Sequence, residues 1–201
     1  MLFRSYYLLG KYLIERGANP NLANKGGWTP LYLATDNRNI ERGDYPVRLG
    51  DMNDLEYIKL LLAKGANVNA RMIDSTETRT VFTNQWLDER GATAFLRASQ
   101  SGDIELMKLL LDRGADPKIA TDLKIDALQV AAGIGWVEGI TYEHSTEETI
   151  QAVKLLLDLG LDPKSGRDLL EVGEGVEGLF SVAQTLLMTS THTCRPREVP
   201  S

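Results

Sequence analysis

The residues that could support catalysis are few and lie far apart in the sequence. Cys194 is the only cysteine of the chain, and a thiol becomes a nucleophile only when a base or positive charge stabilises its thiolate. Cys194 lies in a polar tail beside prolines, where no partner base is recognisable. We therefore interpret it as an inert thiol. As a single cysteine it also excludes an internal disulfide and a thiolate metal site.

Histidines and carboxylates form no recognisable site either. The two histidines, His144 and His192, have no neighbours at the spacing that zinc ligands show. Glu147 and Glu148 are adjacent, so on a helix they point in different directions and cannot act as a catalytic pair. The glycines do not form a phosphate-binding loop. We predict a chain that is not an enzyme, with no catalytic residue, no metal and no cofactor.

Composition narrows the classes of partner. The chain has 201 residues, of which 43% are hydrophobic and 25% charged, as is ordinary for a globular domain. Its net charge is −6 and its Lys and Arg are scattered, which argues against nucleic acid or an anionic membrane as the partner. We see no apolar run long enough to span a membrane and no convincing signal peptide at residues 1–10. The compartment stays open, cytoplasmic by default.

Aromatic side chains are better candidates for contacts with another molecule. Trp28, Trp86 and Trp136 lie between the apolar helix patterns, as do Tyr45 and Tyr142. Trp and Tyr are enriched among the residues that anchor protein interfaces. Each ring could instead fold back over the apolar edge of the element beside it, and the sequence leaves both interpretations open.

The stretch 91–120 shows which elements position these residues. Thr93 can cap one helix, and residues 101–103 can end it and cap a second. Apolar residues at three- and four-residue spacing give the second helix one buried face, and Gly114 can close it in a left-handed conformation. Two helices of about ten residues each are marginally stable alone. This unit therefore needs neighbours to cover its apolar faces.

The same unit recurs along the chain. Four leucine-rich helices are each closed by a glycine: Gly17, Gly65, Gly114 and Gly160. The intervals between these glycines are 48, 49 and 46 residues. The first helix of the unit also returns, because 33 residues separate Ala94 from the equivalent Ala127. Recurrence of both halves predicts a repeat architecture.

These motifs resemble those of the ankyrin-repeat family. Residues 29–34, Thr-Pro-Leu-Tyr-Leu-Ala, match the family signature Thr-Pro-Leu-His-x-Ala with Tyr in place of His. The resemblance covers residues 6–164. It implies an all-α fold, an ankyrin-type α-solenoid of stacked helix-turn-helix repeats, with long loops or short hairpins in the finger positions. The glycine intervals exceed the family period of 33, so the repeats carry insertions, as at 40–50, 71–90 and 136–144, and in this they resemble bacterial ankyrin proteins.

We divide the chain into an array at 1–164 and a C-terminal segment at 165–201. The array comprises a half repeat at 1–23 and repeats at 24–70, 71–120 and 121–164. The C-terminal segment is interpreted as a degenerate repeat or cap with a disordered tail, or as unrelated sequence. The half repeat has a single, apolar helix. Either the array begins in the middle of a repeat, or Phe3 and the nearby tyrosines fold back over that helix.

The resemblance implies a non-enzymatic, monomeric protein-interaction module that binds another protein, of unknown identity, through its finger loops and the concave surface of its first helices. These surfaces select the candidate contacts Trp28, Tyr32, Asp36, Arg71, Trp86, Arg97, Gln100 and Gln129. One alternative is a structural or regulatory segment of a larger enzymatic or electron-transfer protein. Another is a small-molecule pocket between the 71–90 finger and the insertions, lined by Trp86 or Trp136.

Overall fold

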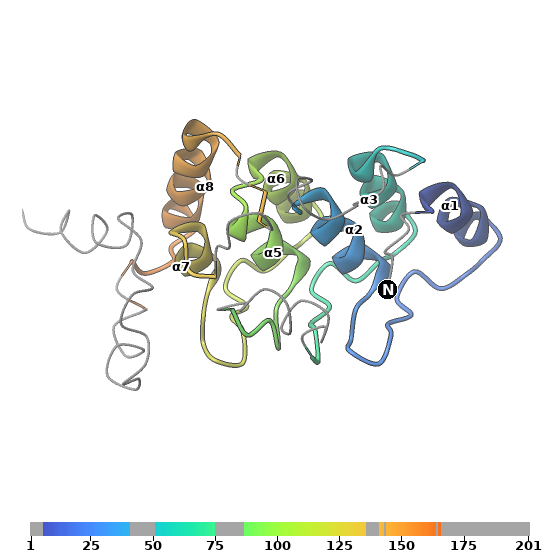
Figure 1. The fold of residues 1–201 in the computed structure, drawn as a ribbon, viewed down its shortest axis with the longest axis horizontal. Helices are drawn as coiled ribbons and strands as arrows, with labels where there is room; N and C mark the ends of the chain where they lie inside the picture. The colour runs from blue at the N-terminus through green and yellow to red at the C-terminus, as the bar shows by residue number, and fades with distance from the viewer. Residues whose placement is uncertain are drawn as a thin grey trace, which may run out of the picture.

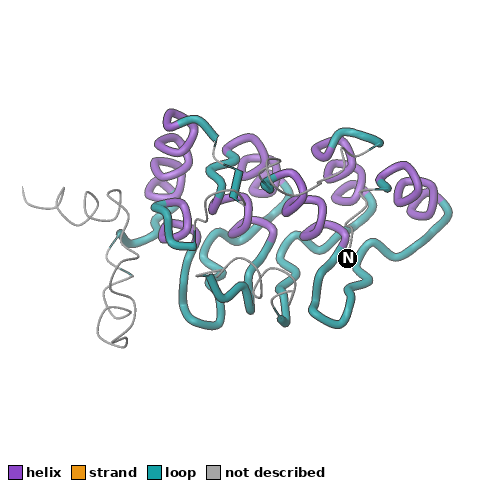
Figure 2. Tube along the Cα trace, viewed as in Figure 1, coloured by secondary structure: helices purple, strands orange, loops and turns teal. Residues whose placement is uncertain are grey.

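The helices of this chain stack side by side into an elongated array, with loops gathered along one edge (Figures 1 and 2). The structure is a computed structural model that describes residues 6–40, 51–74, 87–135, 141–142, 144–163 and 165. None of the helices described is long and apolar enough to cross a membrane.

Two rows of helices make up the described part of the array. The helices are α1 (Tyr7–Glu15), α2 (Pro30–Arg38), α3 (Asp54–Ala63), α5 (Ala94–Gln100), α6 (Ile104–Asp112), α7 (Ala127–Ala131) and α8 (Thr146–Asp158). Within repeats, α2 packs on α3, α5 on α6 and α7 on α8; along the rows, α2 contacts α5, α5 contacts α7, α1 contacts α3 and α6 contacts α8. The predicted all-α solenoid is confirmed.

Side-chain caps determine where the helices begin. Thr93 Oγ1 accepts a hydrogen bond from the Leu96 N–H at 3.2 Å, and Thr29 caps α2 in the same way. Reciprocal capping boxes begin α7 and α8. Each cap satisfies an N–H group that has no partner in the first turn. The caps thereby set which residues of each helix face the core.

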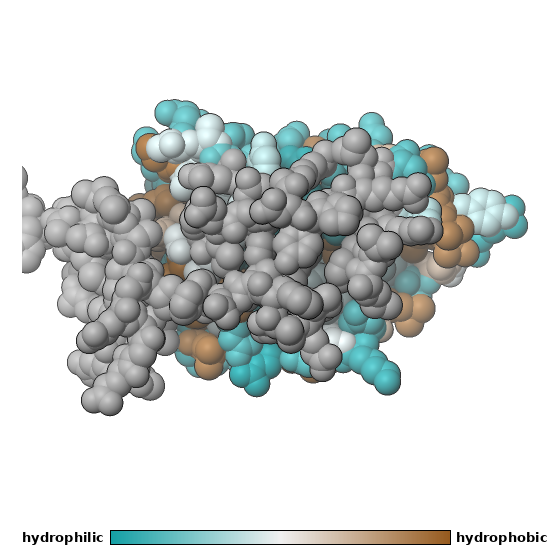
Figure 3. Space-filling view, in the orientation of Figure 1, coloured by the Kyte–Doolittle hydropathy of each residue, from teal (hydrophilic) through white to brown (hydrophobic). Residues whose placement is uncertain are grey.

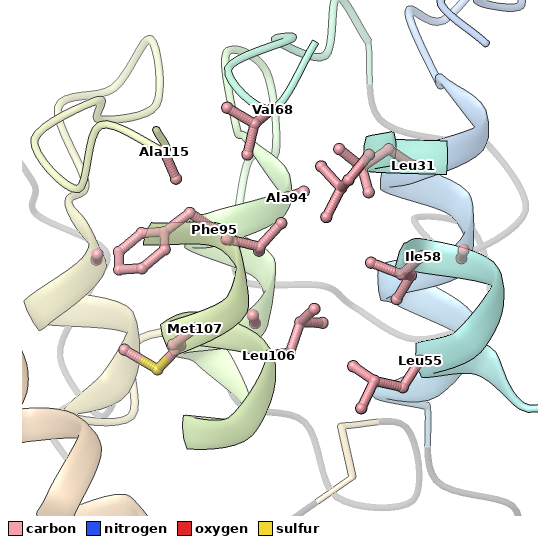
Figure 4. Close-up of a cluster of buried hydrophobic side chains, with 14 of the residues drawn as sticks. Leu31, Leu55, Ile58, Val68, Ala94, Phe95, Leu106, Met107 and Ala115 are labelled. Carbon is pink, nitrogen blue, oxygen red and sulfur yellow. The ribbon is translucent and has the colours of Figure 1, made fainter. Parts of the chain in front are cut away.

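The core runs between the two rows of helices. Figure 4 shows side chains from α2, α3, α5 and α6 meeting there, among them Phe95 and Met107. Phe95 is 1% exposed, and Met107, Ile58 and Leu110 are fully buried. Each repeat therefore buries its apolar residues against its neighbours, and this burial is the main source of stability in a stacked array.

Asparagine side chains link successive loops just after the second helix of each repeat ends. Asn69 Nδ2 donates to the Gly114 carbonyl at 3.0 Å, and its Oδ1 accepts from the Asp116 N–H at 2.8 Å. Asn21 makes the same pair of bonds to residues 65–67. These bonds satisfy backbone groups at the helix C-termini, which otherwise lack partners. They fix the position of each loop on the next.

Gly114 and Gly27 both have positive φ, +87° and +80°, but they differ in their surroundings. A Cβ on Gly114 would meet nothing within 4 Å, whereas one on Gly27 would lie 2.6 Å from the Ile73 backbone nitrogen. We expect Gly114→Ala to lower the free energy of unfolding by about 1–2 kcal/mol, the cost of a left-handed L-residue. Gly27→Ala should cost more, because backbone must also move. Urea unfolding of both variants tests this, and equal losses would contradict it.

Candidate partner-binding surface

The eight predicted contact residues do not share one surface. Five of them are buried, at 0–7% exposure: Trp28, Tyr32, Asp36, Arg97 and Gln129. The structure therefore places these five side chains in the interior rather than on the predicted contact surface. Arg71 is exposed and Gln100 partly so, while Trp86 lies outside the described residues. Tyr45, Trp136, His192 and Cys194 also lie outside them.

Trp28 and Tyr32 belong to a small apolar cluster between the first helices and the fingers. Their rings meet edge to face with centroids 5.1 Å apart, and Met72 and Leu87 are among the other members of the cluster. Trp28 Nε1 donates to the Asp74 carbonyl at 3.4 Å. Aromatic rings with one polar atom are well suited to such a position. For Trp28, the structure thus favours the interpretation in which the ring folds back over its own repeat.

Arg97 and Asp36 form an ion pair inside the array. Arg97 Nε lies 2.9 Å from Asp36 Oδ1, and the two side chains are 3% and 0% exposed. The other guanidinium nitrogens donate to the Asn39 carbonyl at 2.8 Å and to Ser101 Oγ at 2.9 Å. A planar guanidinium can serve several acceptors at once. Arg97 therefore ties the end of α2 to α5.

Described residues from the second and fourth repeats also meet beside this ion pair. Ile40 and Thr141, about 100 residues apart in the sequence, form an isolated antiparallel bridge, and the Tyr142 N–H donates to the Asn39 carbonyl at 3.0 Å. That carbonyl also accepts from Arg97. The contact thus links two repeats that are not neighbours in the stack.

Arg38 adds a second ion pair beside the first. Its Nε lies 2.6 Å from Asp103 Oδ2, and its Nη2 lies 3.0 Å from Glu105 Oε2. Burial by itself would lower the pKa of Arg38, but the hydrogen bond to Asp103 and the nearby carboxylates outweigh burial and raise it. Asp103 also caps α6. These charges are engaged in holding repeats together rather than in presenting a site to a ligand.

Three apolar side chains that the sequence analysis missed protrude from successive finger loops. Leu22 and Ile73 are each 68% exposed, and Leu123 is 49% exposed. Their loops lie along the same edge of the array (Figure 2), and backbone hydrogen bonds join Ile73 to Gly26 and Asp122 to Arg90. We call Leu22, Ile73, Leu123 and the exposed Arg71 the finger edge. The sequence signal was an apolar residue within each polar turn.

Arg71 holds the central part of the finger edge in place. Its Nε donates to the Gly91 carbonyl at 2.9 Å, and its Nη2 donates to the Ala120 carbonyl at 3.1 Å and to Asp122 Oδ1 at 3.0 Å. The side chain remains 48% exposed. Its ion pair with Asp122 contributes at most about 1 kcal/mol at this exposure. Arg71 can therefore support the loops and still present its outer side to a partner.

The described ranges contain no group of three or more His, Cys, Asp or Glu residues that could hold a metal ion. His144 packs edge to face on Tyr142, with ring centroids 4.8 Å apart, and its Nδ1 lies 3.7 Å from Glu148 Oε2 in the first turn of α8. A lone histidine between a ring and a carboxylate is an ordinary packing arrangement.

Comparison with known proteins agrees with this architecture. The ankyrin-repeat family model matches residues 26–73 and 90–122. No curated protein shows a significant match to the chain. The first matched segment contains α2 and α3, and the second contains α5 and α6, so each match holds one complete helix pair of the stack. By its motifs, its stacked helix pairs and this match, the chain contains ankyrin repeats.

Proposed function

We propose that this array binds a protein partner along the finger edge. Ankyrin repeats are generally protein–protein interaction modules, and the family is generally non-enzymatic. The observation that supports the finger edge is the exposure of one large apolar side chain in each of three successive loops, Leu22, Ile73 and Leu123. Exposed apolar residues gathered on one surface mark interaction sites in soluble proteins.

The surroundings of these three residues fit the anatomy of an interface. Charged residues border them, with Lys25 near Leu22 and Lys124 near Leu123 in the sequence, and both are exposed. Arg71 lies between the loops, and arginine is enriched at interfaces. Apolar contacts within a polar rim are typical of complexes whose partners also exist alone. The backbone bonds between fingers hold the contacts in fixed relation, which lowers the entropy lost on binding.

Affinity capture from lysate of the source organism tests this proposal. We expect the double variant Ile73→Asp, Leu123→Asp to retain at least about tenfold less of the partners that the wild-type protein captures. The reason is that a carboxylate placed in an apolar contact stays unpaired. Ile150→Asp is the matched control, since Ile150 is 44% exposed on α8, away from the fingers. Circular dichroism of all variants verifies folding.

The outcome that would overturn the finger edge is equal retention of the same partners by wild type and by the double variant. In that case the contact lies elsewhere on the array. If wild type retains no partner at all, the remaining interpretation is a structural or regulatory segment of a larger protein, and the finger edge is not a docking site.

A further inference from the structure

An exposed apolar face covers α1, at one end of the array. Of the eleven large hydrophobic residues that are exposed in the described part of the chain, five lie in α1 or at its N-cap. They are Tyr6, Leu8, Leu9, Tyr12 and Leu13, each 43–55% exposed. Figure 3 shows hydrophobic surface at this end of the molecule. A contiguous apolar group on a nine-residue helix is far from the scattered pattern of an ordinary surface.

Comparison between repeats identifies the kind of surface this is. When the closing glycines are superposed in sequence, Leu9 and Leu13 correspond to Tyr57 and Leu61 of α3. The equivalent residues of α6 and α8 are Leu106, Leu110, Ala152 and Leu156. All six counterparts are 0–8% exposed, whereas Leu9 and Leu13 are 55% and 48% exposed. On α1, therefore, positions that are core elsewhere in the array face outward.

Tyr57 shows which way these positions point. Its ring stacks on Tyr7 of α1, with centroids 4.5 Å apart and an interplanar angle of 17°. A Cβ on Gly10 of α1 would collide with the same ring. Position 57 therefore faces the preceding helix of its row. Leu9, its counterpart, therefore faces away from α3, on the side of α1 where the row has no further described helix.

Leu8 extends the face beyond what a stacked repeat covers. Its counterparts in the other repeats are Glu56, Glu105 and Gln151, which are polar and exposed. In the other repeats of this chain, the residue at this position is exposed to water. An apolar residue there indicates an additional contact. The apolar face of α1 is thus wider than an inter-repeat face, and it suits a second helix lying directly on α1.

We propose that this occupant is α1 of a second copy of the chain, packed antiparallel across a two-fold axis. Two of the charges beside the face, Lys11 and Glu15, are self-complementary, and a third, Arg16, has its guanidinium carbon 4.3 Å from the centroid of the Tyr12 ring. Lys11 and Glu15 lie on one flank, next to Leu8 and Tyr12, and each is about half exposed. In an antiparallel pair the same flanks meet, so Lys11 of each copy lies opposite Glu15 of the other.

The area is sufficient for a weak dimer. Each of the five side chains exposes about half of its surface, which is roughly 100 Å² per side chain of this size. Two faces would then bury about 1,000 Å², the lower limit for a specific interface. We expect a dissociation constant in the micromolar range, on the order of 1–100 µM. This dimer would replace the monomer implied by the family resemblance, and it is independent of the finger edge.

Sedimentation velocity of the 201-residue chain from about 1 to 100 µM tests the proposal. We expect a monomer–dimer equilibrium that Leu9→Glu abolishes and that two matched controls, Ile150→Glu and the finger-edge variant Ile73→Asp, leave unchanged. Lys11→Glu and Glu15→Lys should each weaken the homodimer at least about tenfold. A mixture of these two variants should form a heterodimer, since its facing charges are opposite. These exposed charge variants test the pairing even if Leu9→Glu fails to fold.

A monomer at all concentrations would overturn the proposal, and so would a dimer that Leu9→Glu and the charge variants leave intact. A monomer in which Leu9→Glu lowers the melting temperature would place the cover of α1 within the same chain, for example in the segment around Phe3. Homodimers of both charge variants with no preference for the mixture would exclude the antiparallel arrangement.

Discussion

Replacement of Arg97 by methionine is expected to lower the free energy of unfolding by about 3–5 kcal/mol, the range seen when one partner of a buried ion pair is removed. The Asp36 carboxylate, 0% exposed, would lose the guanidinium that lies 2.9 Å away. The Asn39 carbonyl and Ser101 Oγ would lose a charged donor in the same substitution. Urea unfolding followed by circular dichroism measures the loss.

Two further variants distinguish the loss of the ion pair from nonspecific destabilisation of the fold. Arg38→Met should cost about 1–3 kcal/mol, because Asp103 keeps its hydrogen bond to the Leu106 N–H as the cap of α6. Combining Arg97→Met with Asp36→Leu should recover part of the stability lost in Arg97→Met alone, since no buried charge is left behind. A loss below about 1 kcal/mol for Arg97→Met would contradict the structural role of this pair.

The burial of Arg97 was foreseeable in part from the repeat pattern. When the helix caps are superposed in sequence, Arg97 occupies the position of Leu33 in α2 and Val130 in α7. Two apolar counterparts indicate a position that faces the interior. The sequence places Arg97 on a first helix but does not show that Asp36 of the preceding repeat lies opposite. That pairing depends on how one repeat is set against the next.

Helix limits could be predicted because their signals are local. The Thr93 cap and the closing Gly114 mark the two ends of the α5–α6 pair, and both act through residues three or four positions away. The bridge between Ile40 and Thr141 could not be predicted, because it joins two insertions that follow no period. The conformation of an insertion is set by contacts made across the whole fold.

The candidate surface was harder to predict than the fold for a related reason. Trp28 was predicted to contact a partner because it is a large aromatic residue in a turn. In the structure its ring is instead part of the apolar cluster under the fingers. Ile73 lies in an equally polar segment and is 68% exposed. Both residues are apolar in a turn-rich context, so residue type alone cannot tell them apart. Only the packing of one finger on the next shows which side chain is covered.

Leu110→Ala should lower the free energy of unfolding by about 2–5 kcal/mol, through lost burial and the cavity that remains. Leu110 is fully buried in α6, in the interior of the array, with α5 and α8 packed beside that helix.

Leu156→Ala is the matched control, because Leu156 is the equivalent residue of α8, is also fully buried, and belongs to the last described helix pair. Repeats contact only their neighbours. Among the described helices, the α5–α6 pair has a helix pair on each side and the α7–α8 pair has one on a single side, so α8 can relax around a cavity more easily than α6. We therefore expect the Leu110 variant to lose more stability than the Leu156 variant in parallel urea titrations. A loss below about 1 kcal/mol for Leu110→Ala would contradict its place in the core. A larger loss for Leu156→Ala would show that α8 is held at least as tightly as α6.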